Sequence, residues 1–199
     1  MSLTVAGAGP GNIELLTQEA IRAIKDADIV AGFERIASDV KPIRNDVKTL
    51  KGISEILDLP IETKKVLVLA SGDPCFFGIT EFIKNKNIKI EKVITGISSM
   101  QYFMGKLQKQ WQTLPFFSFH GRETDFTEMH SKESFFILTD KTNNPDIISA
   151  RLKEEGFKGR LFVGYNLSYP DESIEEYNIG DKIIVKSFLN TVLVQNEKY

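Results

Sequence analysis

Three glycine-containing loops in the first half of the chain have the residue types of a ligand-binding site. Each loop follows a short apolar run that predicts a buried strand. The loops are GAGPG at 7–11, SGDP at 71–74 and TGISS at 95–99. Ligands of open α/β sheets bind beyond the carboxyl ends of the strands, so the three loops are expected to meet at one site. A single glycine after a strand is ordinary turn chemistry, and the prediction therefore depends on this convergence.

The composition of these loops disfavours a ligand that is rich in phosphate. A dinucleotide-binding GxGxxG motif needs a third glycine where the chain has Asn12, and Pro10 removes a backbone donor. No Gly-Lys-Ser/Thr sequence follows, which argues against a Walker loop. None of the three loops contains Lys or Arg, and the second carries the anionic Asp73. The sequence therefore favours a ligand with little negative charge.

S-adenosylmethionine has the chemistry that these loops would accommodate. It combines a hydroxylated sugar, an ammonium group and a flat base with little negative charge. Backbone groups beside small residues could bind its polar parts, and Phe76 or Phe77 could pack against the base. Asp73 also has a structural interpretation, because an Asp in a turn often accepts hydrogen bonds from its own backbone. Both interpretations of Asp73 stay open from the sequence.

Strands and helices alternate along the first half of the chain. The expected strands are Leu3–Ala6, Asp28–Ala31, Val66–Ala70 and Ile90–Thr95, and the expected helices are Leu15–Lys25, Ile79–Lys84 and Ser98–Leu107. Thr17 is the expected N-cap of the first helix. This alternation predicts a parallel sheet that helices cover on both faces.

A second set of elements follows a polar stretch at 109–115, which is the candidate linker. The expected elements are strands at 116–119, 135–138 and 161–164, a helix at 145–155, and a terminal antiparallel pair at 182–188 and 191–195. The predicted fold class is α/β, with two successive α/β domains. Their predicted limits are 1–110 and 111–199.

The overall composition is that of a globular protein with a balanced charge. The chain has 199 residues, 25 basic and 27 acidic side chains, and a formal net charge of -2, which provides no electrostatic footprint for nucleic acid. Cys75 is the single cysteine, and neither a secretory leader nor a membrane-spanning run of about 18 apolar residues is recognisable. A cytoplasmic protein is therefore expected. His120 and His130 have no metal-ligand spacing, so no bound metal is expected.

Seven segments, taken in order, resemble a known family. They are GAGPGNIELLT, ASGDPCFFG, TGISSMQ, FHGRETD, FFILTDKTNNP, VGYNLSYPDE and FLNTVLV, and they span nearly the whole chain. Together they resemble the tetrapyrrole (precorrin) methyltransferases of corrin biosynthesis. The later segments are most similar to the branch that methylates C-5 of cobalt-precorrin-7. The resemblance implies an S-adenosylmethionine-dependent C-methyltransferase whose active site lies in the cleft between its two α/β domains.

The resemblance also implies which residues bind the cofactor, S-adenosylmethionine. Those of the first domain belong to the glycine loops, and those of the second lie near strand ends. They are Pro10, Ser71, Gly72, Asp73, Phe76, Ser98, Ser99, Leu138, Asn166 and Thr191. Gly9 and Gly11 of the first loop would lie at the floor of the active site and contact the substrate.

The chemistry of a precorrin suggests two further residues. This substrate is a flat macrocycle edged with carboxylates, so cationic side chains would help to bind it, and Arg35 and Arg122 are the candidates. Methyl transfer needs an aligned nucleophile more than acids and bases. Holding the reacting carbon within about 3–3.5 Å of the methyl group would supply much of the rate enhancement. No residue is therefore assigned as a catalytic acid or base.

The resemblance also bears on partners and on alternatives. Family members are usually homodimers, so a homodimer is expected, and the related C-15 methylation and decarboxylation would belong to a separate protein. No nucleic-acid or membrane partner is expected. Two alternatives stay open: an enzyme of the same fold acting on another precorrin position or on RNA, and a non-catalytic sensor of an S-adenosyl compound or a nucleotide.

Overall fold

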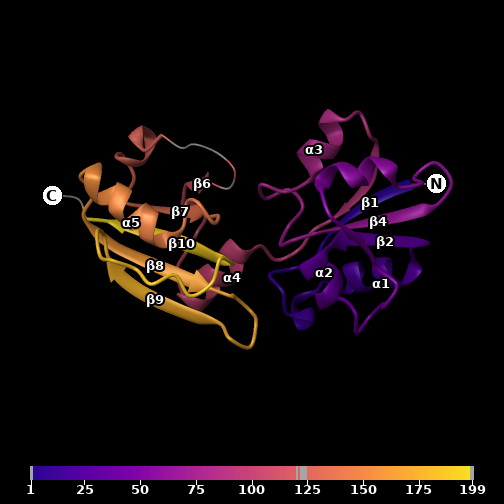
Figure 1. Ribbon diagram of the computed structural model, residues 1–199, viewed down its shortest axis with the longest axis horizontal. Helices are drawn as coiled ribbons and strands as arrows, with labels where there is room; N and C mark the ends of the chain where they lie inside the picture. The colour runs from indigo at the N-terminus through magenta and orange to yellow at the C-terminus, as the bar shows by residue number, and fades with distance from the viewer. Residues whose placement is uncertain (1, 120, 122–124, 198–199) are drawn as a thin grey trace. The chain divides into compact units, whose positions relative to one another are not determined.

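The chain folds into two compact units, each built around one β-sheet. The structure is a computed structural model that describes residues 2–119, 121 and 125–197. The units are Met1–Ser99 and Met100–Tyr199, and Figure 1 labels their helices and strands. The predicted domain limits place the boundary further along the chain, at residue 110, and stay a prediction.

The first unit contains a parallel sheet with the strand order β3-β2-β4-β1-β5. Its strands are β1 (Ser2–Gly7), β2 (Ile29–Phe33), β3 (Lys48–Leu50), β4 (Lys65–Ala70) and β5 (Ile90–Ile94). Its helices are α1 (Gln18–Asp26), α2 (Glu34–Asp39) and α3 (Thr80–Asn85), with 3-10 turns η1 (Ile13–Leu15) and η2 (Ile53–Asp58). The predicted parallel sheet is confirmed, while β3 and α2 were not predicted.

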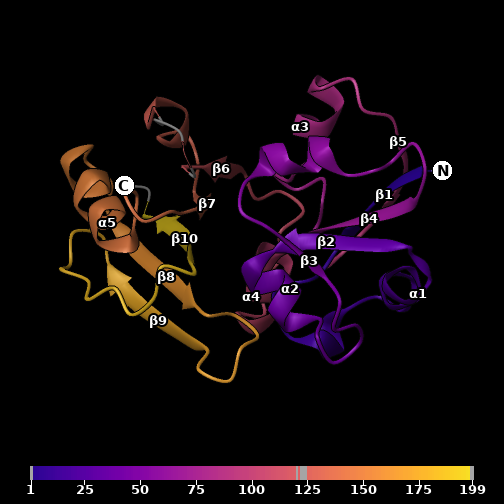
Figure 2. The same ribbon diagram turned by 45° about the vertical axis from the view of Figure 1, so that its right-hand side comes forward.

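Helices cover both faces of this sheet. Successive residues of a buried strand point to opposite sides, so each face carries apolar side chains that need a covering helix. Leu67 and Leu69 of β4 pack in the cluster that contains Ile24 of α1. Val66 and Val68 of the same strand belong to the opposite cluster, which contains residues of η2 and α3. Figure 2 shows α1 and α2 on one side of the sheet and α3 on the other.

The first helix begins where the sequence predicts. The Thr17 hydroxyl oxygen accepts a hydrogen bond from the Ala20 backbone N–H at 3.1 Å, which satisfies one of the unpaired donors of the first turn. The predicted N-cap is therefore confirmed. The preceding residues form η1 instead of the start of one longer helix.

The second unit contains a mixed sheet with the strand order β6-β7-β10-β8-β9. Its strands are β6 (Phe116–Ser118), β7 (Ser134–Leu138), β8 (Gly159–Tyr165), β9 (Ser173–Asn178) and β10 (Asn190–Asn196). Strands β6 and β7 are parallel, and the other neighbours are antiparallel. Its remaining elements are η3 (Thr127–Met129) and α5 (Pro145–Glu154), and helix α4 (Ser99–Lys106) begins at the last residue of the first unit.

Helix α5 covers one face of this second sheet. Ile148 and Leu152 of the helix are buried against Ile137, Val163 and Val192 of the three central strands. Figure 1 shows the helix lying along the sheet. The helix and the three strand regions at 116–119, 135–138 and 161–164 therefore confirm the predicted α/β character of the second half.

The predicted terminal antiparallel pair is wrong. The segment 182–188 contains the β-branched apolar run Ile183–Val185, which predicts a strand, yet it forms no strand, and β10 pairs with β7 and β8 instead. Ile183 is buried whereas Ile184 is 83 % exposed, so neighbouring side chains point to opposite sides as they would in a strand. The backbone N–H of Ile183 donates to the Asp146 carboxylate of α5 and not to a neighbouring strand. The edge strand β9, whose sequence SIEEYN is largely polar, was missed.

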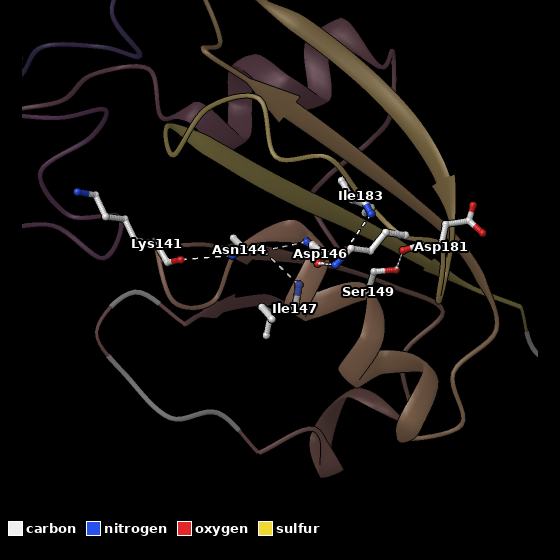
Figure 3. A network of polar contacts seen from close by, with 8 residues as sticks. Lys141, Asn144, Asp146, Ile147, Ser149, Asp181 and Ile183 are labelled. Carbon is white, nitrogen blue, oxygen red and sulfur yellow. Dashed lines mark hydrogen bonds and ion pairs between the residues drawn. The ribbon is translucent and has the colours of Figure 1, made fainter.

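Side chains near the start of α5 bind this irregular segment (Figure 3). Asn144 caps the helix by accepting from the Asp146 and Ile147 backbone N–H groups at 3.1 and 3.2 Å. Asp146 accepts from the Lys182 ammonium at 2.6 Å and from the Ile183 N–H at 2.8 Å. These two interactions, with Lys182 the larger cause, hold the pKa of Asp146 below its ordinary value. Asp146 thus takes the place of a strand partner.

The Asp146 contact predicts a pH-dependent contribution to stability. A carboxyl group whose pKa is lower in the folded state stabilises the fold above its unfolded pKa, here 3.8, and loses this contribution as the pH falls through the folded pKa. We expect Asp146→Asn to lower the free energy of unfolding by about 1 kcal/mol at pH 7. Urea denaturation at pH 7, 5 and 3 would measure the difference from wild type. A difference that stays constant down to pH 3 would contradict the prediction.

Candidate functional site

The first two glycine loops lie against each other at the carboxyl ends of β1 and β4. The Gly72 N–H donates to the Gly9 carbonyl at 2.9 Å, and the Gly9 N–H donates to the Gly72 carbonyl at 3.3 Å. Gly72 has a φ of +63°, a left-handed conformation that favours glycine. The two loops are therefore joined by a short antiparallel bridge.

The third loop joins them so closely that side chains would not fit. A Cβ atom at Gly96 would lie 2.3 Å from the Gly72 carbonyl oxygen, and a Cβ at Gly7 would lie 2.4 Å from the same oxygen. A Cβ at Gly72 would lie 3.3 Å from Cα of Ser98. The backbones of three strand ends thus pack directly on one another. The predicted convergence of the three loops is confirmed.

Asp73 connects the second loop to the third. One of its carboxylate oxygens accepts from the Cys75 N–H at 2.8 Å, and the other accepts from the Gly96 N–H at 3.1 Å. The first contact is the turn interaction that the sequence left open for this residue. The second fixes the position of the third loop. Direct contact of Asp73 with a cofactor stays a prediction.

The other first-unit candidates surround this packed centre. Pro10, Gly9 and Gly11 are buried in the first loop. Ser98 is buried and Ser99 is half-buried where the third loop enters α4.

Two aromatic residues and one cation complete this group. Phe76 is half-buried and its ring packs edge-on against Phe77, with 5.0 Å between the centroids. Phe77 has a φ of +51° and is 45 % exposed, which is an unusual combination for an aromatic residue. The Arg35 guanidinium donates from Nη2 to Oγ of Ser71 at 2.7 Å. Arg35 and Ser71 are therefore linked beside the packed loops.

The candidates of the second unit gather at one end of its sheet. Leu138, the last residue of β7, lies opposite Thr191 of β10. Thr191 is buried, and its hydroxyl donates to the Ile137 carbonyl at 2.9 Å. Asn166 follows β8 directly, and its N–H donates to the Leu189 carbonyl at 2.9 Å. The three predicted residues thus lie close together within their own unit.

Asn166 is a hub of hydrogen bonds in a left-handed conformation, with a φ of +45°. Its amide nitrogen donates to Asp171 at 2.7 Å, and its amide oxygen accepts from the Ser187 hydroxyl at 2.6 Å. Its backbone carbonyl accepts from the Tyr169 N–H at 2.9 Å. With each polar group engaged inside the chain, Asn166 determines the shape of this loop. A contact of Asn166 with the cofactor stays a prediction.

Sequence reasoning missed three polar residues that position this hub. The Thr139 hydroxyl lies 2.5 Å from the Asn190 carbonyl and 2.7 Å from the Asn190 amide oxygen. The Asn190 amide donates to the Ser187 carbonyl at 2.7 Å, and Ser187 in turn contacts Asn166. Asn190 lies in the quoted FLNTVLV segment, which was the available signal. Ser187 lies 21 positions from Asn166, and no local pattern links them.

Helix α4 holds the loop that follows Asn166. Lys106 lies 2.9 Å from a carboxylate oxygen of Glu172, and the other oxygen accepts from the Ser168 N–H at 2.6 Å. Burial alone raises the pKa of Glu172, but the Ser168 amide and Lys106 outweigh it and hold the pKa below its ordinary value. Ser168 has a φ of +72°, so this loop contains two left-handed residues other than glycine. Such conformations persist only where surrounding contacts enforce them.

The remaining observations concern residues that the sequence singled out for other reasons. Arg122 and His120 lie outside the described residues. Among the described residues, no group of three or more His, Cys, Asp or Glu side chains is placed to hold a metal ion. In the same part of the chain, no helix is both long and apolar enough to cross a membrane.

Two α/β units with glycine loops at the strand ends are the features from which a family of proteins can be sought. Comparison of the sequence with protein families identifies it. Residues 2–182 match the family described as Tetrapyrrole (Corrin/Porphyrin) Methylases. The chain belongs to this family. The predicted family and the predicted class of enzyme, a methyltransferase, are therefore confirmed.

Named relatives show which members of the family the chain is similar to. It is 33 % identical to the cobalt-precorrin-7 C(5)-methyltransferase of Salmonella typhimurium, over 98 % of this chain and 100 % of the relative. It is 31 % identical to the probable cobalt-precorrin-7 C(5)-methyltransferase of Methanocaldococcus jannaschii, over 85 % and 86 % of the two chains. Both similarities cover most of the chain and are not limited to the glycine loops.

Solved structures support the fold class. The precorrin-6Y methylase of Archaeoglobus fulgidus has a TM-score of 0.78 at 22 % identity, with 99 % of each chain covered. The uroporphyrin-III C-methyltransferase of Thermus thermophilus, solved in complex with S-adenosylhomocysteine, has a TM-score of 0.78 at 20 % identity, with 97 % of each chain covered. The predicted fold of the tetrapyrrole methyltransferase type is thus confirmed.

Proposed function

We propose that this protein transfers a methyl group from S-adenosylmethionine to C-5 of cobalt-precorrin-7 during construction of the corrin ring. The observation that carries the proposal is the 33 % identity to a cobalt-precorrin-7 C(5)-methyltransferase, which extends over 98 % of this chain and 100 % of the relative. The convergence of the three glycine loops supports it, because it provides one backbone-lined site at the strand ends.

The residues at the strand ends fit S-adenosylmethionine. Gly7, Gly72 and Gly96 let the backbones of three strand ends pack on one another, and this convergence would place amide and carbonyl groups together for a sugar and an amino acid. The three loops carry no Lys or Arg, and Asp73 adds a negative charge that suits a cationic ligand. When bound, S-adenosylmethionine supplies a methyl group on a positively charged sulfur. In this proposal Pro10, Ser71, Gly72, Asp73, Phe76, Ser98 and Ser99 hold it, and Leu138, Asn166 and Thr191 of the second unit contribute to its binding.

The protein's own contribution is orientation. The rigid packing of the three loops would fix the cofactor, and the cations Arg35 and Arg122, together with Gly9 and Gly11, would hold the carboxylate-edged macrocycle against it. Fixing the reacting carbon close to the methyl group reduces the entropic part of the barrier. No side chain is assigned as a catalytic acid or base. A cytoplasmic homodimer, with a separate protein for the C-15 step, completes the proposal.

A turnover assay tests the proposed reaction. Purified protein is incubated with cobalt-precorrin-7 and S-adenosylmethionine that carries a ¹³C-labelled methyl group, and the product is examined by mass spectrometry and NMR. We expect one added methyl group at C-5, with S-adenosylhomocysteine as the second product. Uroporphyrinogen III serves as the comparison substrate, because the uroporphyrinogen-III C-methyltransferase of Cyanidium caldarium is 33 % identical over 48 % of this chain and 45 % of the relative.

Two other results would decide against the proposal. Labelling at another ring position, or preferential methylation of uroporphyrinogen III, would indicate an enzyme of the same fold with a different substrate. Saturable binding of S-adenosylhomocysteine without transfer to any tetrapyrrole would indicate a sensor. Calorimetry with S-adenosylhomocysteine, NADH and ATP would separate the sensor from a nucleotide-binding protein.

A further inference from the structure

Two residues that the sequence assigns to different ligands are in direct contact. Arg35 is a candidate for binding the substrate and Ser71 for binding the cofactor, yet Nη2 of Arg35 lies 2.7 Å from Oγ of Ser71. Ser71 follows β4, and Arg35 is the second residue of α2, which follows β2. Strands β2 and β4 are parallel neighbours, with Gly32 beside Leu69. The fold of the sheet therefore brings the two side chains together.

The contact joins an exposed cation to a hydroxyl group that can still donate its proton. A hydroxyl group has one donor and two acceptor positions, so Ser71 accepts from Arg35 and retains its own proton for donation. A guanidinium group has five N–H donors in a planar arrangement, and Nη2 supplies the one that Ser71 accepts. Asp39, one turn further along α2, lies 3.5 Å from Nη1 and orients the guanidinium. The Arg35 side chain is 36 % exposed, so solvent and ligands can reach it.

We propose that Arg35 and Ser71 together bind one carboxylate group, with Arg35 supplying the charge and directing the Ser71 hydroxyl. A cation beside a hydroxyl donor suits a carboxylate, and a planar guanidinium fits a carboxylate better than an ammonium group does. The inference rests on the proposed function, in which both ligands carry this group. The carboxylate belongs either to the amino-acid part of the cofactor or to the edge of the tetrapyrrole.

Binding measurements on matched variants test the pair. The variants are Arg35→Gln, Ser71→Ala and the double variant, with Arg22→Gln on the exposed face of α1 as the control. The ligands are S-adenosylhomocysteine, 5′-methylthioadenosine, which lacks the amino-acid carboxylate, and uroporphyrin III, a stable polycarboxylate tetrapyrrole. Calorimetry is used for the first two, and quenching of protein fluorescence for the third. Thermal unfolding shows whether each variant folds, and Ser71→Ala keeps the test valid if Arg35→Gln does not.

The expected result is a loss of about 10- to 100-fold in affinity for one carboxylate ligand in Arg35→Gln, as for a hydrogen bond to a charged group. The double variant should bind no more than about twofold more weakly than Arg35→Gln, because the two side chains act as a unit. If binding of S-adenosylhomocysteine is weakened while binding of 5′-methylthioadenosine is unchanged, the pair binds the cofactor carboxylate. If binding of uroporphyrin is weakened while binding of S-adenosylhomocysteine is unchanged, the pair binds a tetrapyrrole carboxylate.

Two results would overturn the inference. In the first, Arg35→Gln and Ser71→Ala bind every ligand as the control does. In the second, binding of 5′-methylthioadenosine is weakened as much as binding of S-adenosylhomocysteine, which would mean that Arg35 only shapes the loop. Failure of the proposed function has a different signature, because wild-type protein would then not bind S-adenosylhomocysteine at all, while the uroporphyrin measurement would still test the pair.

Discussion

Gly96→Ala is expected to abolish detectable binding of S-adenosylhomocysteine and to lower the free energy of unfolding by about 3 kcal/mol. The new Cβ would lie 2.3 Å from the Gly72 carbonyl oxygen and 2.9 Å from Cα of Gly7. Both atoms belong to backbone of neighbouring strand ends, so no side chain can rotate away to make room. The three loops must separate, and the proposed cofactor site separates with them.

Gly105→Ala is the matched control for this substitution. Gly105 lies in α4, and a Cβ there would meet no atom within 4 Å. Alanine is a better helix former than glycine by up to about 1 kcal/mol, so this variant should be as stable as wild type or more stable. Urea denaturation and calorimetry with S-adenosylhomocysteine measure both variants. If Gly96→Ala bound the ligand as tightly as Gly105→Ala does, the glycine loops would not be the cofactor site.

The first unit could be predicted well because its signals are local. Val66–Ala70 is a short, continuous apolar run, which is what a strand buried on both faces requires, and a glycine turn ends it. Thr17 marks the start of α1 through a contact only three residues away. Ligands bind at the carboxyl ends of parallel strands, and this rule then predicted that the three loops meet at one site. The short helix α2 carries no N-cap side chain that the sequence could reveal.

The second unit was predicted less well because its decisive contacts are distant in sequence. The segment 182–188 contains the β-branched apolar run Ile183–Val185 that predicts a strand, but Asp146, 37 positions away from Ile183, accepts the hydrogen bond from the Ile183 N–H. Strand β9 has the sequence SIEEYN, in which the apolar Ile174 and the aromatic Tyr177 are three positions apart, so apolar periodicity does not reveal it. For the site, the motifs indicated Asn166 but not its hydrogen bond to Ser187. Local patterns therefore located the residues, while their partners required the fold.

The Asn166 hub makes a second prediction with a large expected effect. Asn166→Asp keeps the shape of the side chain, and both residue types tolerate the left-handed conformation. It replaces the amide donor that lies 2.7 Å from the Asp171 carboxylate by a negatively charged oxygen. One hydrogen bond to a charged group is lost and a close repulsion is gained, with solvent screening part of it. We expect the free energy of unfolding at pH 7 to fall by about 2 kcal/mol.

A rescue variant and a control separate charge from shape in this prediction. In the double variant Asn166→Asp with Asp171→Asn, the amide and the carboxylate exchange places, so the donor–acceptor pair is restored and most of the lost stability should return. Asn87→Asp is the control, because Asn87 is an exposed residue with a φ of +58° and should change stability by less than about 0.5 kcal/mol. Urea denaturation of wild type, Asn166→Asp, the double variant and Asn87→Asp measures these differences. Equal effects at 166 and 87, or no recovery in the double variant, would mean that the contact with Asp171 does not hold this loop in place.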